Sequence, residues 1–176
     1  ADAQIFSFCG GGNNGGDGYV ITRHLANMGA QVTAYAVVDP EKLDGDAQVN
    51  YAIADKLGLI EPLHTREQLV ALETENRRPH VVVDAMLGTG FTGEVREPMA
   101  SVIHLANSYR EKDARIIAVD VPSGLDCDTG QPGNATIQAD VTVSFVAVKR
   151  GYLQQESQGY GGRVVIAEIG APGWLA

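Results

Sequence analysis

Residues 9 to 18 read Cys-Gly-Gly-Gly-Asn-Asn-Gly-Gly-Asp-Gly and separate an apolar run from an amphipathic pattern. The apolar run covers residues 5 to 8, and apolar side chains recur at helical spacing from residue 17 to Met28, before Gly29. A strand, a glycine-rich loop and a helix are therefore expected. Such a junction directs several backbone N–H groups and the positive end of a helix dipole towards one point, where a phosphate can bind.

Three polar side chains in this loop add a second chemistry to the expected anion site. Asn13, Asn14 and Asp17 supply carboxamide and carboxylate oxygens, which suit a metal ion or a sugar hydroxyl rather than a phosphate. Asp17 fits an N-cap of the following helix equally well, so ligand contact and capping both stay open for it.

The rest of the chain alternates between apolar runs and helical patterns. Further strands are expected at residues 31–38, 80–84, 115–120, 141–148 and 164–169, and helices at 47–57, 65–75 and 98–109. Thr65 and Gln68 have capping-box spacing at the start of one helix. This alternation predicts an α/β fold, with a parallel sheet covered on both faces and the first five strands in the order 2-1-3-4-5. Residues 121–139 are expected to form one long functional loop.

Composition narrows the class of protein. A chain of 176 residues with 44% hydrophobic content fits a single domain with one core. The formal net charge of −9 argues against a nucleic-acid partner, which needs clustered basic residues. No apolar run approaches the roughly 18 residues of a membrane span. Cys9 and Cys127 show neither zinc-ligand nor disulfide spacing, so a reducing cytoplasm is the expected location.

Two acidic residues end neighbouring predicted strands. Asp84 follows three valines, while Asp120 ends the next strand and Ser123 lies shortly after it. Asn14, Asp84 and Ser123 together offer amide, carboxylate and hydroxyl oxygens, a set for a hard cation whose identity the residues leave open. Asp120 stands on a rigid turn where an acid–base group is usefully placed, although it could also brace the loop.

Other candidate groups have simpler explanations. Lys149 and Arg150 follow the fifth strand and could reach an anionic ligand or be solvated. The four histidines have no metal-ligand spacing and are expected to be structural. Gly10, Gly12 and Gly15 match GxGxxG, and Asp39 lies where a ribose-binding acid would lie, as in an NAD-dependent dehydrogenase. The chain, however, has no room for a separate substrate domain.

Three segments taken together resemble the YjeF N-terminal-domain family, the NAD(P)HX epimerases: residues 12–18 (GNNGGDG), 84–90 (DAMLGTG) and 120–126 (DVPSGLD). The resemblance runs from the first strand to about Gly170. It implies a Rossmann-like three-layer αβα sandwich with a mostly parallel sheet, formed by a single domain over residues 1–176 without the family's N-terminal helical segment. It also implies an isomerase of metabolite repair, which epimerises the hydrated forms of NADH and NADPH so that a partner dehydratase can consume the S epimer.

The same resemblance assigns residues to roles. It puts the substrate on Asn13, Asn14, Gly15, Gly16, Asp17, Gly88, Thr89, Gly90, Phe91, Thr92, Gly93, Glu94 and Asp120. It puts a potassium ion on Asn14, Asp84 and Ser123, and we hypothesise that Asp120 is the acid–base group. A homodimer in the cytoplasm is expected, with neither nucleic acid nor membrane as a partner. The alternative is a non-catalytic nucleotide-binding or interaction module of the same fold.

Overall fold

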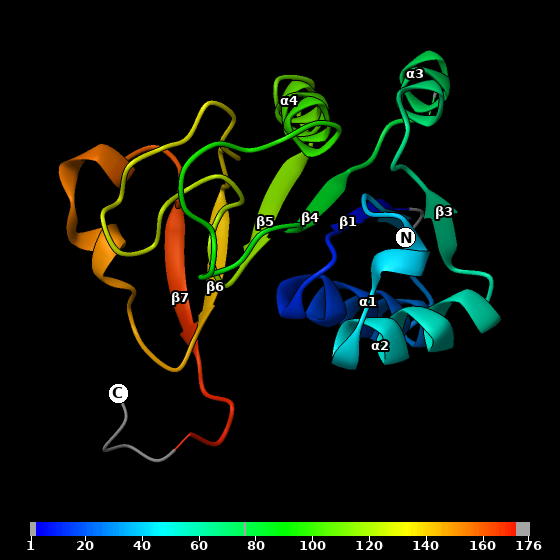
Figure 1. Cartoon of the computed structure of the whole chain (residues 1–176), viewed down its shortest axis with the longest axis horizontal. Coiled ribbons are helices and arrows are strands. Elements are labelled where there is room, and N and C mark those ends of the chain that lie inside the picture. The colour runs from blue at the N-terminus through cyan, green and yellow to red at the C-terminus, as the bar shows by residue number, and fades with distance from the viewer. Residues whose placement is uncertain (1–2, 76, 172–176) are drawn as a thin grey trace.

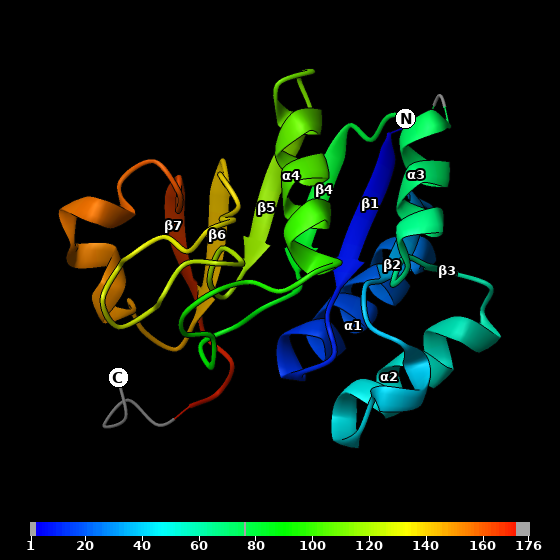
Figure 2. The same ribbon diagram turned by 45° about the horizontal axis from the view of Figure 1, so that its top comes forward.

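The computed structural model describes residues 3–75 and 77–171 of the chain and contains a seven-stranded sheet. All neighbouring strands are parallel, in the order β3-β2-β1-β4-β5-β6-β7 (Figure 2). The strands are β1 (Gln4–Cys9), β2 (Gln31–Ala36), β3 (Ile60–Pro62), β4 (Val81–Ala85), β5 (Arg115–Val119), β6 (Val141–Phe145) and β7 (Arg163–Ala167). The predicted order 2-1-3-4-5 corresponds to β2-β1-β4-β5-β6 and is confirmed. The strand order reverses direction between β1 and β4.

Helices cover both faces of this sheet and complete the predicted α/β sandwich. They are α1 (Asn13–Asn27), α2 (Gly45–Lys56), α3 (Arg66–Thr74) and α4 (Met99–Arg110), with 3-10 turns η1 (Pro40–Lys42), η2 (Arg150–Leu153) and η3 (Gln155–Ser157). Helices α1 and α2 lie on one face, and α3 and α4 lie on the other (Figure 1). The capping box of α3 is present as predicted. In the described part of the chain, no helix has the length and apolarity needed to cross a membrane.

The central strands are buried on both sides, as their apolar sequences require. In β1, Phe6 and Phe8 belong to the core beneath α3 and α4, whereas Ile5 and Cys9 belong to clusters on the face of α1 and α2. Successive side chains of a strand point to opposite faces, so a continuous apolar run is what a doubly covered strand needs.

Helix α1 begins four residues earlier than predicted. Gly12 is its N-cap, so both asparagines and both following glycines lie in the first turn of the helix rather than in a loop. Asp17 therefore lies beyond the first four helical residues, and the expectation that it caps the helix is wrong. Gly15 and Gly16 disfavour a helix by propensity alone, but they allow the close packing against Gly10 and against Ala47 of α2 that holds this turn.

Two strand predictions also need correction. β3 was not predicted, because only three residues pair with the edge of β2. β6 ends at Phe145 rather than residue 148, because Val146 has φ 68° and turns the chain out of the sheet. Lys149 consequently lies outside the strand, as the N-cap of η2. Residues 121–139 contain neither helix nor strand, as expected for a long loop.

Candidate functional site

The glycine-rich turn is packed tightly against the end of β4. The Gly10 amide donates to the Ala85 carbonyl oxygen over 3.0 Å. A Cβ atom on Gly10 would lie 1.9 Å from the Met86 carbonyl oxygen, and one on Gly15 would lie 2.0 Å from the Gly10 carbonyl oxygen. These approaches exclude any side chain at either position, so the glycines bring the α1 N-terminus directly beside the turn that follows β4.

The three residues expected at the cation meet around the main chain of Leu87. Asn14 Nδ2 donates to the Leu87 carbonyl oxygen over 2.8 Å, and the Leu87 amide donates to Ser123 Oγ over 2.8 Å. Ser123 Oγ in turn donates to Asp84 Oδ1 over 2.5 Å, and the Ser123 amide donates to Asp84 Oδ2 over 2.7 Å. Residues from α1, β4 and the loop after β5 are thus joined in one hydrogen-bonded cluster.

Asp84 is the charged member of this cluster and is fully buried. In the described chain, no Lys or Arg side chain pairs with its carboxylate, so its partners are the Ser123 hydroxyl and the Ser123 and Met86 amides. Burial raises the pKa of Asp84 to about 6, although these hydrogen bonds act in the opposite direction. A buried carboxylate without a positive partner is costly, and a bound cation would remove that cost.

Asn14 supplies a second sign of a missing partner. Its Oδ1 atom is buried and has no hydrogen-bond partner among the described residues, while its Nδ2 atom donates to the Leu87 carbonyl oxygen. Across residues 3–75 and 77–171, no group of three or more His, Cys, Asp or Glu side chains could hold a metal ion. The cluster is a different kind of set, with one carboxylate among neutral oxygens. Such a set fits a hard cation, for which Asn14 Oδ1 is a candidate ligand.

Asp120 lies at the end of the neighbouring strand, immediately after β5. Its φ angle of 62° places it in the left-handed region, which an aspartate adopts more readily than most residues. Its carboxylate forms an ion pair with Lys149, with Nζ 2.8 Å from Oδ1. Asp17 and Asp120 line the same cavity, and partial burial together with the charge of Asp120 raises the pKa of Asp17 above its usual range.

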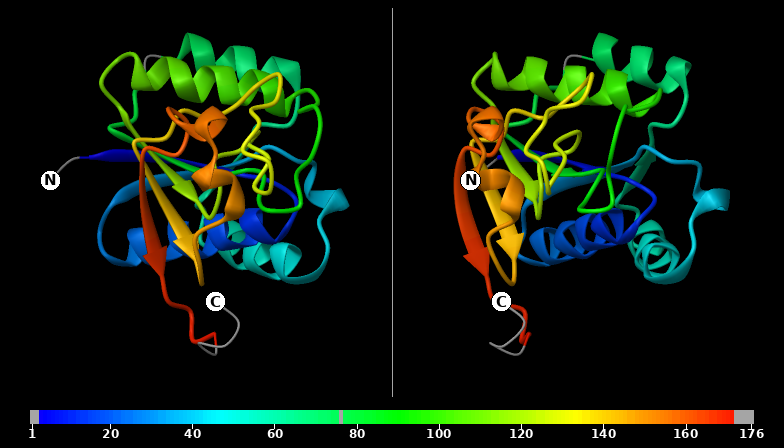
Figure 3. Two further views of the ribbon diagram at one scale, coloured as in Figure 1. Left: turned by 90° about the vertical axis from the view of Figure 1, so that its left-hand side faces the viewer. Right: turned by 60° about the vertical axis from the view of Figure 1, so that its left-hand side comes forward.

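Two loops beyond the strand ends contact each other. Asn134 makes two hydrogen bonds with the main chain of Val95, of 2.7 and 3.1 Å. Cys127 Sγ donates to the Thr89 carbonyl oxygen over 3.3 Å. The loop after β4 and the loop after β5 therefore form a common rim at the carboxyl edge of the sheet, and Figure 3 shows the two segments in green and yellow.

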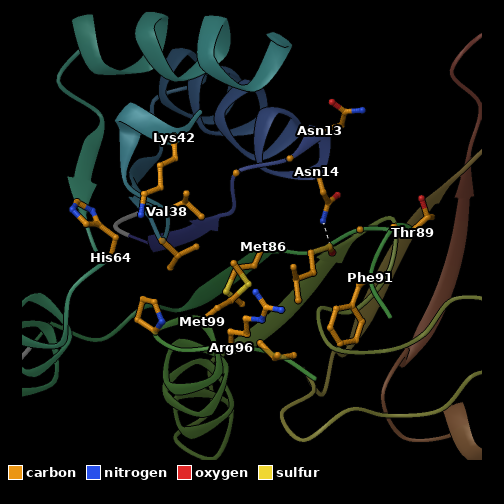
Figure 4. A pocket seen from close by; sticks show the side chains of 18 of the residues that line it. Asn13, Asn14, Val38, Lys42, His64, Met86, Thr89, Phe91, Arg96 and Met99 are labelled. Carbon is orange, nitrogen blue, oxygen red and sulfur yellow. Dashed lines mark hydrogen bonds between the residues drawn. The ribbon is translucent and has the colours of Figure 1, made fainter. Parts of the chain in front are cut away.

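A cavity of about 1180 Å³ opens at this edge, at the point where the strand order reverses. In parallel α/β sheets, ligands bind at such a reversal point. Figure 4 shows Asn13 and Asn14 on one side of the cavity, together with Thr89 and Phe91, and Lys42 and His64 on the other. It is lined by Gly11, Gly12, Asn13, Asn14, Asp17, Val37, Val38, Asp39, Lys42, His64, Met86, Leu87, Gly88, Thr89, Gly90, Phe91, Thr92, Glu94, Val95, Arg96, Glu97, Pro98, Met99 and Asp120.

Most residues expected at the substrate line this cavity. The exceptions are Gly15, Gly16 and Gly93. Gly15 and Gly16 are buried within α1, where a Cβ atom on Gly16 would lie 3.3 Å from Cα of Ala47 in α2. Gly93 has φ 86° and turns the loop. These three glycines shape the backbone, and the wall itself is formed by their neighbours.

Sequence reasoning missed the wall on the β2 and β3 side and the part of the loop after β4 that contains Arg96. Lys42 and Arg96 were not singled out, His64 was expected to be structural, and Asp39 was considered only for a dehydrogenase. Asp39 Oδ1 caps η1 by accepting from the Glu41 amide over 3.1 Å, and Asp39 also lines the cavity. A prediction of β3 would have placed His64, two residues beyond it, at the carboxyl edge.

Comparison with known proteins agrees with this geometry. Residues 1–151 match the family model described as YjeF-related protein N-terminus. The chain belongs to this family. Within the YjeF-related family it is 41% identical over 171 residues to the NAD(P)H-hydrate epimerase of Pirellula staleyi, covering 96% of this chain and 74% of that protein. It is also 40% identical to the bifunctional NAD(P)H-hydrate repair enzyme of Moorella thermoacetica, of which it spans only 32%.

The fold of this YjeF-related chain also occurs in a solved structure. The crystal structure of yeast ynu0 matches with a TM-score of 0.72, covering 95% of this chain and 66% of the yeast chain. The two sequences are 24% identical, so this likeness supports the α/β architecture.

Proposed function

We propose that this chain is an NAD(P)H-hydrate epimerase, an isomerase that interconverts the R and S epimers of NADHX and NADPHX. Two relatives that carry this name support the proposal. The chain covers 74% of the length of the proteins from Pirellula staleyi and Nitrosopumilus maritimus. The observation that carries the proposal is the Asp120 carboxylate on the wall of a cavity of about 1180 Å³, beside the glycine-rich start of α1.

Different residues of the cavity contact different parts of the substrate. The N-terminal turn of α1 presents free backbone amides for the diphosphate, and Asn13, Asn14 and Asp17 contact the substrate from that side. The loop of residues 88–94, which lies next to Asn14, contacts it from the same side of the cavity. Asp120 is then adjacent to the hydroxylated carbon of the nicotinamide ring.

Epimerisation on this site needs one proton carrier. Asp120, protonated, donates its proton to the ring hydroxyl, the carbon–oxygen bond breaks, and water leaves while the ring nitrogen lone pair stabilises the cationic ring. Water then adds to the opposite face of the same carbon and returns a proton to Asp120. Because nothing is consumed, positioning and a single acid–base group are sufficient.

The cluster around Asp84 is proposed to hold a potassium ion. Asn14, through its unpartnered Oδ1, and the side chains of Asp84 and Ser123 would be its ligands. When bound, the ion supplies a fixed positive charge next to the diphosphate region of the cavity. Asp84 and Ser123 do not line the cavity themselves, so their role is to hold the floor of the site in place.

A coupled assay tests the proposal. A mixture of R and S NADHX is supplied with excess S-specific dehydratase, and recovery of NADH is followed with the wild type, with Asp120→Asn and with no epimerase. Wild type should accelerate full recovery, and Asp120→Asn should lose at least about 100-fold in turnover while binding the substrate nearly as well, since amide nitrogen cannot carry the proton. Equal loss of binding and turnover would contradict the role of Asp120.

Recovery that stalls at the S fraction with the wild type would instead support a non-catalytic binding module. The bifunctional relatives, named repair enzymes, are consistent with functional coupling to a dehydratase. A homodimer and a cytoplasmic location stay predictions, to be checked by light scattering and by fractionation of cells.

A further inference from the structure

Lys149 lies where the chain leaves the sheet after β6, and both of its polar contacts are inside the protein. Its Nζ atom is 2.8 Å from Asp120 Oδ1 and donates to the Phe145 carbonyl oxygen over 2.9 Å. The side chains of Lys149 and Asp120 are only 20% and 16% exposed. The ammonium of Lys149 therefore contacts both the last residue of β6 and the carboxylate of Asp120, which directly follows β5.

In the described chain, the polar contacts of the Asp120 side chain are all made by one carboxylate oxygen. Oδ1 accepts from Lys149 Nζ, from the Phe145 amide over 3.0 Å and from Ser144 Oγ over 3.2 Å. Within the described residues, Oδ2 has no hydrogen-bond partner. It is also not one of the buried polar atoms left without a partner. Asp120 lines the cavity, so Oδ2 is the oxygen available to a ligand.

We propose that Lys149 is a positioning residue for the epimerisation, which holds Asp120 by Oδ1 so that Oδ2 exchanges the proton with substrate. The inference rests on the proposed function and assigns a role to a residue that does not line the cavity. Lys149 is the charged donor among the three groups that contact Oδ1, so its ion pair adds a Coulombic attraction that the Ser144 and Phe145 donors do not supply.

The main chain of Asp120 is fixed separately from its carboxylate. Its φ of 62° is a sparsely populated conformation for a residue with a side chain, and it persists only where the surroundings fix it. The Asp120 amide donates to the Val143 carbonyl oxygen over 2.8 Å, and the Tyr152 hydroxyl donates to the Asp120 carbonyl oxygen over 2.8 Å. These contacts fix the main chain, and Lys149 fixes the direction of the carboxylate.

The other ionisable groups near Asp120 do not offer a substitute cation. Asp17 on α1 adds negative charge, and Tyr152 and Cys127 are neutral groups whose pKa values are raised, chiefly by burial. In the described part of the chain, Lys149 is the one basic side chain that pairs with Asp120. Arg150, next to Lys149, is exposed and makes no hydrogen bond or ion pair there, so it provides a matched control.

The test uses Lys149→Met, Lys149→Arg and Arg150→Met in the same coupled assay. Misplacing a catalytic group by about 1 Å costs on the order of 100-fold, so Lys149→Met should lower kcat by about that factor with KM changed less than about threefold. Lys149→Arg keeps the charge and should recover at least about tenfold of the loss. Arg150→Met, which removes the same charge without the contact, should match the wild type within about twofold.

A double-mutant cycle separates positioning from general destabilisation. If Lys149 acts through Asp120, Lys149→Met should cost less than about twofold in an Asp120→Asn background, measured at high enzyme concentration above the spontaneous rate. A full additional loss there, or an unchanged kcat in the single variant, would overturn the inference. Should Lys149→Met fail to fold, as judged by circular dichroism, Lys149→Arg with and without Asp120→Asn gives the same comparison. An inactive wild type would contradict the proposed function itself, and this result differs from an active wild type whose kcat does not depend on Lys149.

Discussion

The buried carboxylate of Asp84 should make the stability of the protein depend on potassium, and Asp84→Asn should abolish that dependence. Without a cation, the folded state holds an ionised carboxylate in a site with no exposed surface. Asparagine keeps an acceptor for the Ser123 amide and offers an N–H to Ser123 Oγ, so the variant retains most of the cluster while it loses the charge.

The magnitude follows from the pKa of Asp84. Burial raises it from 3.8 to about 6, and at about 1.36 kcal/mol per unit this destabilises the folded state at neutral pH by about 3 kcal/mol. The folded state binds the proton more tightly than the unfolded state. Stability in potassium-free buffer is therefore greatest below about pH 4 for this group and falls as the pH rises to about 6.

The assay is urea unfolding at neutral and mildly acidic pH, in potassium chloride and in choline chloride of equal ionic strength. Potassium at about 100 times its dissociation constant adds about 2.7 kcal/mol to the wild type, which offsets most of the burial cost at pH 7. In choline chloride, Asp84→Asn should be as stable as the wild type or more stable at pH 7. In potassium chloride, the advantage of Asp84→Asn should shrink to within about 0.5 kcal/mol, because the ion stabilises only the wild type.

The reasoning fails if potassium stabilises wild type and Asp84→Asn equally, because the ion then binds elsewhere. It fails as well if the wild type in choline chloride is equally stable at both pH values. Sodium and lithium chloride at the same ionic strength are the controls for ion size, since a general salt effect would not distinguish these ions from potassium.

Two further predictions concern the backbone. Gly15→Ala should destabilise by about 3 kcal/mol or more in urea unfolding, because its Cβ would meet the Gly10 carbonyl oxygen at 2.0 Å, whereas Gly90→Ala has open space and should stay within about 0.5 kcal/mol; similar effects for both would contradict this packing. Thr65→Ala removes the hydroxyl that accepts from the Gln68 amide in the α3 capping box and should cost about 1 kcal/mol, with no loss if water replaces the cap.

The sheet could be predicted from the sequence because its signals are local. Each of the central strands is an apolar run bounded by glycine, proline or acidic residues, and each crossover helix has its own periodicity. Asp84 and Asp120 could be placed at one edge for the same reason, since parallel strands end on the same side. Order and handedness then followed from general rules rather than from particular side chains.

The remaining errors come from contacts between distant parts of the chain. β3 has three residues, and its pairing of Ile60 with Ala34 is invisible in the sequence around it. The start of α1 was misplaced because Gly15 and Gly16 have low helix propensity, and tertiary packing overrides propensity there. The contact of Lys149 with Asp120 depends on the turn at Val146. Valine rarely adopts a positive φ, so nothing in the sequence signals this turn.

The two acidic strand ends show how environment divides roles between identical groups. Both oxygens of Asp84 accept hydrogen bonds, and no basic side chain of the described residues pairs with this buried carboxylate, so it suits a cation rather than a substrate. Asp120 has one oxygen held by Lys149, and its other oxygen is available at the cavity, so it can exchange a proton. The ammonium of Lys149 already balances its negative charge. Exchanging the two environments would exchange the two roles, because the residue type is the same and only the neighbours differ.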